Sequence, residues 1–267
     1  GDKMSISFTP LGSGSKGNSI LVSNEKQKFL IDCGLCFSEL KNRLFSIDVK
    51  IEDLEGVVIT HEHIDHIKSA KILSRRCEIP VYARYETMPK LVEILGCFEG
   101  ICYEQGEILT VGDMEITSFS TPHDAVAPVG YMITDKDSKA VYATDLGCVT
   151  SELINVSNGA GLVMIESNYD PEMLKSGPYP AFLKTRIGSD YGHLSNYACA
   201  DAVLEMLNKG TNKFILGHLS ENNNTRQKTG ETLLSVLKKS GAELGTDYYA
   251  KIAWQHKVTE SVSTATV

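Results

Sequence analysis

The sequence predicts one α/β domain over residues 1–267. Short apolar segments typical of strands dominate the early part of the chain, and strands alternate with helical patterns in the later part, as in proteins that cover sheets with helices. The sequence contains neither an internal repeat nor a linker, and a chain of this length can bury enough surface to fold without disulfide or metal staples.

Strands are expected first, because polar and apolar residues alternate or form short apolar runs, and turn residues separate them. The elements predicted in this part are strands at 5–11, 20–22 and 28–31, a helix at 37–45, a strand at 56–60, a helix at 64–77, a strand at 81–83 and a helix at 87–95. A Gly/Ser-rich loop at 12–18 separates the first two strands.

Alternation between residues 107 and 144 predicts further strands, with turns at 112–113 and 135–138. Ser151 is expected to cap a short helix, because its hydroxyl can accept a free backbone N–H. Residues 171–192 hold three prolines and three glycines and are expected to be mostly irregular, as functional loops often are. The elements predicted after residue 160 are a strand at 162–165, a helix at 196–207 capped by Asn196, a strand at 213–216, a helix at 229–240, a strand at 248–254 and a frayed tail at 260–267.

Composition restricts the classes of function. The net charge of −8 argues against a protein that binds nucleic acid through bulk positive charge, although a local basic groove stays possible. The chain has no apolar run long enough to span a bilayer, so no membrane partner is expected. Seven cysteines, an odd number, fit a reducing cytoplasm, and the isolated CxxC of Cys33 and Cys36 is expected to be two half-buried structural thiols.

Three of the seven histidines fall in the six residues from His61 to His66. Neutral imidazole and carboxylate are the preferred ligands of divalent Zn, Mn or Fe. His61 and His63 stand two apart at a strand end and can point to one side. Asp65 and His66 follow where the chain enters a helix, from which they can reach a second ion. The alternative is a solvated His/Asp loop.

Three further ligand types each follow an apolar strand. His123 follows the strand at 116–119, Asp145 the strand at 141–143, and His218 the strand at 214–216. Each residue alone would more often lie on the surface. Together with the first motif they predict one shared site, because such sites are built from loops on a rigid scaffold.

The motif from His61 to His66, followed by His123, Asp145 and His218 in this order, resembles the metallo-β-lactamase superfamily. The resemblance implies a four-layer αββα sandwich of two mixed β-sheets flanked by helices. It also implies two metal-binding triads, namely His61, His63 and His123 for one ion and Asp65, His66 and His218 for the other, with Asp145 bridging the two. True β-lactamases of this fold typically carry cysteine at the bridging position, whereas a carboxylate suits a dinuclear hydrolase.

Three motifs, at 12–19, 191–196 and 217–224, are similar to those of the YycJ/WalJ subfamily, which is related to the tRNase Z and RNase J phosphodiesterases. This resemblance implies a nuclease, including 5′-to-3′ trimming of DNA, and therefore nucleic acid, in the first place DNA, as substrate. The chain has no large insertion between Asp145 and His218 and no long exosite arm, and both absences weaken a transfer of RNA specificity from those relatives.

Other polar residues suit a phosphodiester substrate. Ser13, Ser15 and Asn18 of the Gly-rich loop can hold phosphate oxygens, although a plain tight turn has the same composition. Lys184 and Arg186 can bind a flanking phosphate, and a solvated charge pair is the alternative.

His193 stands in a Gly-rich turn before a helix cap, where an imidazole can protonate a leaving oxygen. A structural histidine bonded to the backbone is the other interpretation.

The predicted enzyme holds two divalent ions, Zn in the first place with Mn or Fe as alternatives. The ions would lower the pKa of a bridging water to about 7. Asp65 would orient the hydroxide, and His193 would protonate the departing oxygen. Two rival functions stay open: a glyoxalase II-like thioester or lactone hydrolase with the same cage, and a non-catalytic metal-binding protein. Oligomeric state, exo or endo action and polarity cannot be predicted.

Overall fold

The computed structural model describes residues 5–265, which form two β-sheets packed face to face. The strands of the first sheet are β1 (Ser7–Gly12), β2 (Ser19–Ser23), β3 (Lys28–Ile31), β4 (Val57–Val58), β5 (Val81–Arg84), β6 (Ile101–Tyr103) and β14 (Val262–Ser263). The strands of the second sheet are β7 (Ile108–Val111), β8 (Met114–Ser120), β9 (Val129–Asp135), β10 (Ser138–Ala143), β11 (Leu162–Glu166), β12 (Lys213–Gly217) and β13 (Tyr249–Ile252).

Both sheets mix parallel and antiparallel pairing. The first has the order β14-β1-β2-β3-β4-β5-β6 and the second β13-β12-β11-β10-β9-β8-β7. In the first sheet β3, β4, β5 and β6 run parallel, and in the second β10, β11, β12 and β13 do. Strand β8 runs in the direction of β10, because each pairs antiparallel with β9 between them.

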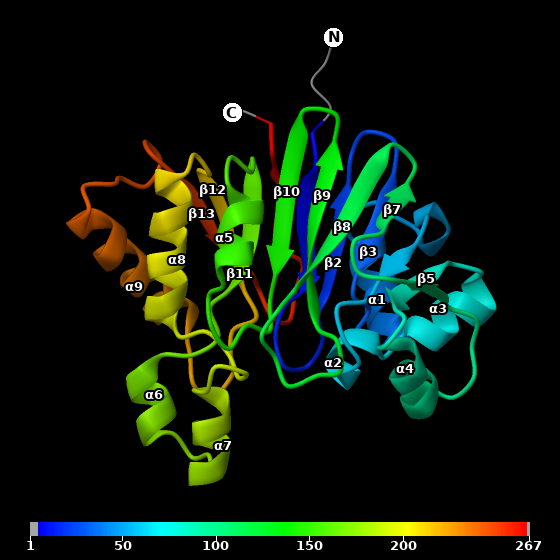
Figure 1. Ribbon diagram of the computed structural model, residues 1–267, viewed down its shortest axis with the longest axis horizontal. Coiled ribbons are helices and arrows are strands. Elements are labelled where there is room, and N and C mark those ends of the chain that lie inside the picture. The colour runs from blue at the N-terminus through cyan, green and yellow to red at the C-terminus, as the bar shows by residue number, and fades with distance from the viewer. Residues whose placement is uncertain (1–4, 266–267) are drawn as a thin grey trace.

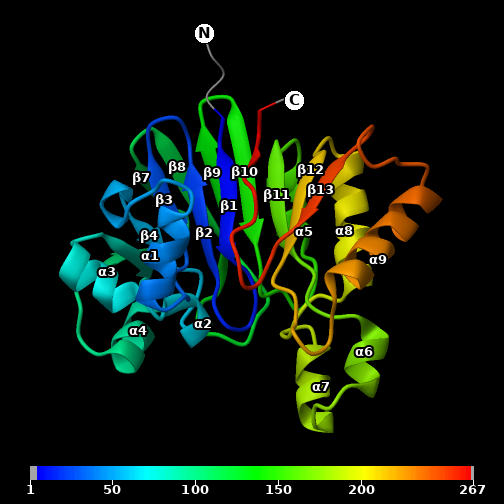
Figure 2. The ribbon, with the colours of Figure 1, turned by 180° about the vertical axis from the view of Figure 1, so that it is seen from behind.

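Helices cover the outer faces of both sheets (Figures 1 and 2). They are α1 (Phe37–Phe45), a 3-10 turn (Ile51–Asp53), α2 (Ile64–Ile67), α3 (Ala70–Cys77), α4 (Met88–Leu95), α5 (Ser151–Ser157), α6 (Pro171–Ser176), α7 (Ala181–Ile187), α8 (Asn196–Asn208) and α9 (Arg226–Lys239). Helices α1, α3 and α4 lie on the first sheet and α5, α8 and α9 on the second, whereas α6 and α7 project from one end. The predicted αββα sandwich is therefore confirmed. No helix within residues 5–265 is both long and apolar enough to cross a bilayer.

Three apolar clusters hold the layers together. One fills the space between the sheets, and each of the others lies between a sheet and its helices. Tyr131 and Tyr142 are the largest fully buried side chains, and both lie in the central cluster. The Tyr131 hydroxyl donates to the Ile59 carbonyl (2.5 Å), so the central layer fixes the chain directly before His61.

Residues 171–192 are largely helical, which corrects the expected irregular segment. Pro171 occupies the first turn of α6, where its missing N–H leaves no hydrogen bond unmade, and the Asp170 side chain caps the helix by accepting from Met173 N (2.9 Å). Gly177 and Gly188 end α6 and α7. The prolines and glycines thus start and stop two short helices.

Other predicted boundaries also shift. Thr150 rather than Ser151 caps α5, and Ser195 rather than Asn196 caps α8. The last helix starts earlier than expected, at Arg226 behind the cap Thr225. Two other elements differ from the prediction. The helix expected at 64–77 breaks at Ser69, whose N–H donates to the Cys33 carbonyl. Strand β6 is an additional strand that the sequence did not predict.

The chain end is more ordered than predicted. Residues 262–263 form β14, which pairs with β1, so part of the expected frayed tail at 260–267 belongs to the sheet. Residues 266–267 lie outside the described part. Of the two thiols expected to be half-buried, Cys33 is buried and Cys36 is exposed, because Cys36 stands just outside α1.

Candidate metal centre

The four polar residues of the first motif lie at the end of β4 and the start of α2. His61 Nε2 is 3.0 Å from His63 Nδ1, and the His61 and His66 ring centroids are 4.1 Å apart. Gly34 packs against this turn so closely that a Cβ there would meet the Asp65 carbonyl oxygen at 1.6 Å. A glycine is therefore required for the loop after β3 to support the motif.

The other three candidate ligands come from separate loops, after β8, β10 and β12. Asp145 and His218 have positive φ angles of 58° and 53°, a conformation that residues with side chains seldom adopt. The strain is offset locally for His218, because its N–H donates to the buried Ser13 hydroxyl (2.8 Å). Such strained residues concentrate at functional sites.

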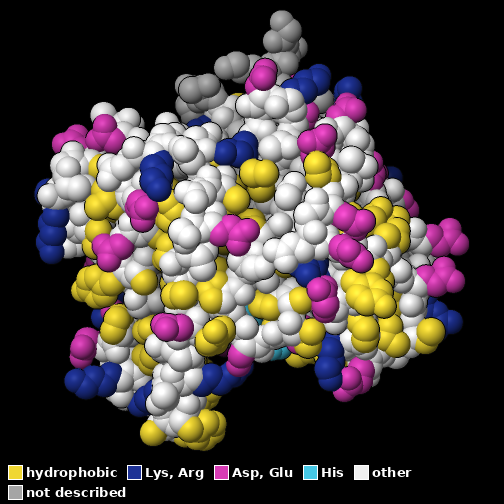
Figure 3. All heavy atoms as spheres, viewed as in Figure 1, with side chains coloured by type: hydrophobic (Ala, Val, Ile, Leu, Met, Phe, Trp, Pro, Cys, Tyr) yellow, Lys and Arg dark blue, Asp and Glu magenta, His cyan; other side chains and the backbone are white. Residues whose placement is uncertain are grey.

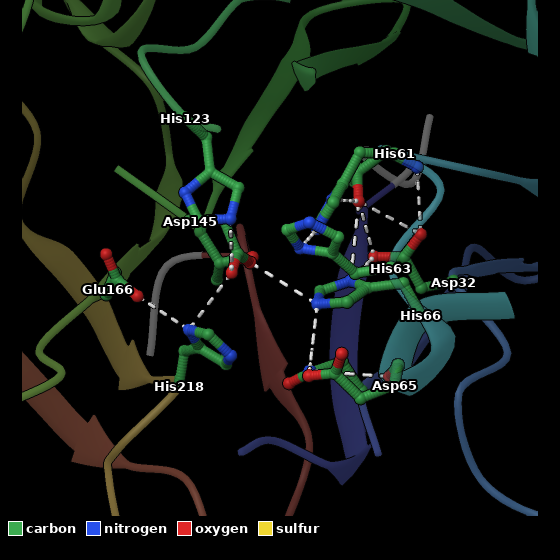
Figure 4. A network of polar contacts seen from close by, with 12 residues as sticks. Asp32, His61, His63, Asp65, His66, His123, Asp145, Glu166 and His218 are labelled. Atoms are coloured by element: carbon green, nitrogen blue, oxygen red, sulfur yellow. Dashed lines mark hydrogen bonds and ion pairs between the residues drawn. The ribbon is translucent and has the colours of Figure 1, made fainter. Parts of the chain in front are cut away.

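These loops meet at one end of the sandwich (Figure 4). Asp145 Oδ2 lies 3.5 Å from His66 Nε2, and Asp145 Oδ1 lies 3.7 Å from His123 Nε2 and 3.5 Å from His218 Nδ1. Four groups have ligand atoms that all lie within 4.8 Å of one another: His61, His63 and His123; Asp65, His66 and His218; His61, His66 and Asp145; and Asp145, Glu166, His193 and His218. The structure thus brings together the residues of both expected triads and places Asp145 beside both.

The donor set fits divalent cations. Among residues 5–265, neither Asp145 Oδ2 nor His218 Nε2 has a hydrogen-bond partner, although both atoms are buried. Burying a polar atom without a partner is unfavourable, and a cation would supply the missing contact. Imidazole nitrogen and carboxylate oxygen are also the donors that first-row divalent metals prefer.

The electrostatics of the cluster favour positive charge. Burial alone would lower the pKa of His66, but the carboxylates of Asp145, Asp32 and Asp65 outweigh burial and raise it to about 10. Burial likewise opposes the charged form of His218, yet Asp145 and Glu166 raise its pKa to about 9. The site therefore attracts protons, and by the same field it attracts metal cations.

For His61 and His123, the effect of burial on the pKa outweighs that of the nearby carboxylates. Burial holds the pKa of His61 well below its usual value and lowers that of His123, so both imidazoles are neutral at pH 7. Burial would raise the pKa of Asp145, but the surrounding imidazoles, His218 first, hold it well below its usual range. Neutral imidazole and ionised carboxylate are the forms that bind metal.

Two buried carboxylates that the sequence analysis missed orient the imidazoles. Asp32 Oδ2 lies 2.7 Å from His66 Nδ1, and the same carboxylate accepts from the N–H and hydroxyl of Thr60. Glu166 Oε1 lies 2.6 Å from His218 Nδ1. Each is an acidic residue at or just after the end of an apolar strand, the same signal that identified Asp145. Carboxylates of this kind fix the tautomer and direction of a ligating histidine.

His193 lies beside the cage and not in either triad. Its Nδ1 is 2.8 Å from the same Glu166 oxygen that holds His218, and its side chain is 20% exposed. Glu166 Oε2 accepts from the N–H groups of Leu146 (2.9 Å) and Leu194 (3.0 Å), so all sides of this carboxylate are bonded. Burial would raise the pKa of Glu166, but His193 and His218 lower it to about 2.

A cavity of about 380 Å³ opens onto this cluster and contains Asp65, Asp145 and His193 in its wall. Figure 3 shows the hollow at the base of the α6–α7 projection, where histidine reaches the surface. Arg186 of α7 also lines the cavity, and its guanidinium pairs with Asp124 (2.5 Å).

Only some of the residues expected to bind substrate line the cavity. Ser15 and Arg186 line the cavity. Ser13 and Asn18 are buried, because their side chains support the loops: Ser13 accepts from His218 N, and Asn18 accepts from Gly14 N. Lys184 is half-buried and donates to the Lys175 carbonyl (2.7 Å), so it is engaged within the α6–α7 projection. The geometry thus departs from expectation for Ser13, Asn18 and Lys184.

Two known proteins are similar in sequence to this chain over most of its length. The exodeoxyribonuclease WalJ of Streptococcus pneumoniae is 37% identical over 251 residues, which cover 92% of this chain and 93% of that protein. The exodeoxyribonuclease YycJ of Bacillus anthracis is 34% identical over 245 residues, with 91% and 93% coverage.

The fold is shared more widely. The metallo-β-lactamase fold protein YhfI from Bacillus subtilis superimposes with a TM-score of 0.73 at 21% identity, covering 96% of this chain and 99% of that one. Residues 12–218 match the metallo-beta-lactamase superfamily, a range that runs from the Gly-rich loop to the last candidate ligand. This chain therefore belongs to the metallo-beta-lactamase superfamily.

Proposed function

We propose that this chain is a metal-dependent phosphodiesterase that shortens DNA from an end. One observation carries the choice of DNA: two relatives that match more than nine-tenths of the chain are both exodeoxyribonucleases. The chemistry of the site is compatible with that substrate, because a cluster of cation ligands and a histidine with its own carboxylate face one open cavity. The thioester and lactone alternative has no feature of the site in its favour.

The proposal includes two divalent cations, Zn in the first place, with Mn or Fe as alternatives. His61, His63 and His123 would hold one, Asp65, His66 and His218 the other, and Asp145 would contact both. When bound, such cations lower the pKa of water toward 7 and offset charge on phosphate oxygens. The buried atoms of Asp145 and His218 that lack hydrogen bonds support this assignment.

His193 is proposed to protonate the leaving oxygen. Its Nδ1 faces Glu166, so Nε2 is the nitrogen that can give a proton into the cavity. The ionised Glu166 carboxylate stabilises a positive charge on the ring and fixes its direction. Because the same oxygen also bonds His218, one carboxylate would position both the proton donor and a metal ligand.

Asp65, Ser15 and Arg186 are proposed to act on the substrate side. Asp65 is partly exposed in the cavity wall and would orient the attacking water. Arg186 uses its Nε and one terminal nitrogen on Asp124, which leaves donors free for a phosphate oxygen. Ser15 is exposed and also lines the cavity, where its hydroxyl would bond a phosphate oxygen.

A reducing compartment such as the cytoplasm is part of the proposal. All seven cysteines lie in the described part of the chain and are free there. Unpaired thiols, several of them exposed, are typical of proteins that work under reducing conditions.

The test is hydrolysis of end-labelled single-stranded and duplex DNA by protein loaded with Zn or Mn. A bis-aryl phosphodiester and a thioester are assayed in parallel. We expect stepwise shortening of DNA and turnover of the phosphodiester, both abolished by EDTA and restored by metal. Rapid hydrolysis of the thioester with DNA left intact would show that the enzyme is an acyl hydrolase instead.

A further inference from the structure

A second cavity, of about 510 Å³, lies beside the candidate active site and has no part in the function proposed above. Three segments form it: the loop after His218, the start of α9, and the turn at 253–257 that follows β13. Helix α9 and strand β13 pack against one another in this region (Figure 2).

One residue that lines this cavity is Trp254, the chain's only tryptophan. The Arg226 guanidinium lies 3.7 Å from the centroid of its ring and the Lys257 ammonium 3.9 Å from it. Trp254 is 39% exposed, so part of its side chain is open to solvent. An aromatic ring with cations beside it is the arrangement that binds the bases and phosphates of single-stranded nucleic acid.

The two cations lack acidic partners. Over residues 5–265, no carboxylate lies within ion-pair distance of Arg226 or Lys257. The guanidinium is partly buried, and burial lowers its pKa. On a chain of net charge −8, these residues form a local positive site.

The cavity is built rigidly. Arg226 donates to the Ile252 carbonyl, and Gln255 donates to the Leu219 carbonyl. Trp254 N donates to the Thr259 hydroxyl (2.8 Å), which closes the turn. Lys257, by contrast, is exposed and free to leave the ring for a phosphate.

The two cavities are neighbours that share one lining residue. Ser220, two residues after His218, lines both. Glu221 also lines the second cavity, where its carboxylate pairs with Lys16 of the Gly-rich loop (3.0 Å) and with His256 (2.7 Å). A strand that enters the active site past Ser15 would pass Ser220 to reach Trp254.

We propose that this cavity binds a single-stranded segment of the DNA substrate next to the scissile phosphate. One base stacks on Trp254, and Arg226 and Lys257 contact the phosphates on either side of that base. The inference rests on the proposed nuclease function. It adds that affinity for long substrates comes from a site separate from the metal cage.

The test compares two substrates of the metal-loaded enzyme: a single-stranded oligonucleotide, which can reach the cavity, and bis(4-nitrophenyl) phosphate, which cannot fill it. For Trp254→Ala we expect KM for the oligonucleotide to rise at least about fivefold, the lower end of the effect of removing one stacked base. The KM and kcat for the small diester should stay within about twofold. Trp254→Phe keeps a stacking face and should recover most of the affinity.

Charge is tested separately. Lys257→Ala should weaken the salt dependence of the oligonucleotide KM by about 0.7 in log–log slope, because the protein then neutralises one phosphate fewer. Lys239→Ala, at the far end of α9, removes the same charge and should leave the slope unchanged.

The proposal is overturned if Trp254→Ala and Lys257→Ala both bind and cleave the oligonucleotide like the unmodified enzyme. Failure of the proposed function looks different, because the unmodified enzyme would then hydrolyse neither DNA nor the small diester. Thermal unfolding of each variant shows whether it is folded. Should Trp254→Ala not fold, Lys257→Ala decides alone, because its side chain is exposed.

Discussion

The first sheet supplies four candidate ligands from one short segment after β4, whereas the second supplies three, each from its own loop. On the first side, the strand end and the following helix turn place His61, His63, Asp65 and His66 close together by local geometry. On the second side, Asp145 and His218 adopt strained positive φ angles, and the His218 loop is held by Ser13 from a distant segment. The second half of the cage therefore depends on the packing of the whole sandwich.

Each side also has one buried carboxylate that supports an imidazole. Asp32 holds His66 alone, and Glu166 holds both His218 and His193. The two carboxylates are fully buried. They differ in that only Glu166 connects the metal cage to the candidate proton donor, so the two sides should respond differently to mutation.

Asp145→Ala should have the largest effect, because Asp145 is the expected bridging ligand and lies beside both triads. We expect loss of bound metal and a fall in phosphodiester turnover of at least about a thousandfold, as several kcal/mol of metal catalysis disappear. Metal content by mass spectrometry and kcat measure the two effects. Asp113→Ala, an exposed carboxylate in the β7–β8 turn, is the control. Full metal content in Asp145→Ala would contradict the assignment.

His193→Ala should separate chemistry from metal binding. We expect two metals to remain bound while kcat falls by about 10²- to 10⁴-fold, the range for a lost general acid. A small diester with a good leaving group needs little protonation, so its rate should fall less than that of DNA. Unchanged kcat on DNA would exclude His193 as proton donor.

Glu166→Gln and Asp32→Asn should then distinguish the two supporting carboxylates. Both should weaken metal binding by about 10- to 100-fold, as is usual when the partner of a ligating histidine is removed. With metal supplied in excess, Asp32→Asn should recover most of its kcat, but Glu166→Gln should not, because His193 also loses its partner. Competition with a chelator gives the affinities. Equal recovery in both variants would mean that Glu166 serves only the metal.

Ser13→Ala should have the smallest effect. It tests the hydrogen bond that holds the strained His218 loop. Removing the buried acceptor of the His218 N–H should lower the free energy of unfolding by about 1–3 kcal/mol. The KM for DNA should not change, because the buried hydroxyl is engaged by the His218 backbone. Urea unfolding and steady-state kinetics measure both. A raised KM with unchanged stability would favour a phosphate-binding role for Ser13.

Local patterns predicted much of this molecule. The apolar runs before His61, His123, Asp145 and His218 predicted strand ends that lie within about two residues of the observed ones, and helix α1 has the predicted bounds. Prediction failed where a residue's role depended on its neighbours in space. The prolines and glycines at 171–192 suggested irregular structure. They begin and end helices instead, because flanking residues such as Asp170 cap those helices. Asp32 and Glu166 were missed because an acidic residue after a strand does not reveal which imidazole it faces.

Ligand chemistry and order along the chain were properties of the sequence, since residue type and strand periodicity are local and need no knowledge of distant contacts. Tertiary structure alone decided which side chains share an oxygen, as His193 and His218 do at Glu166, and which loop residues are buried, as Ser13 and Asn18 are. It also decided that Trp254 stands between two cations without acidic partners among residues 5–265. These relations join residues far apart in sequence, and only the packing of one sheet on the other sets their distances.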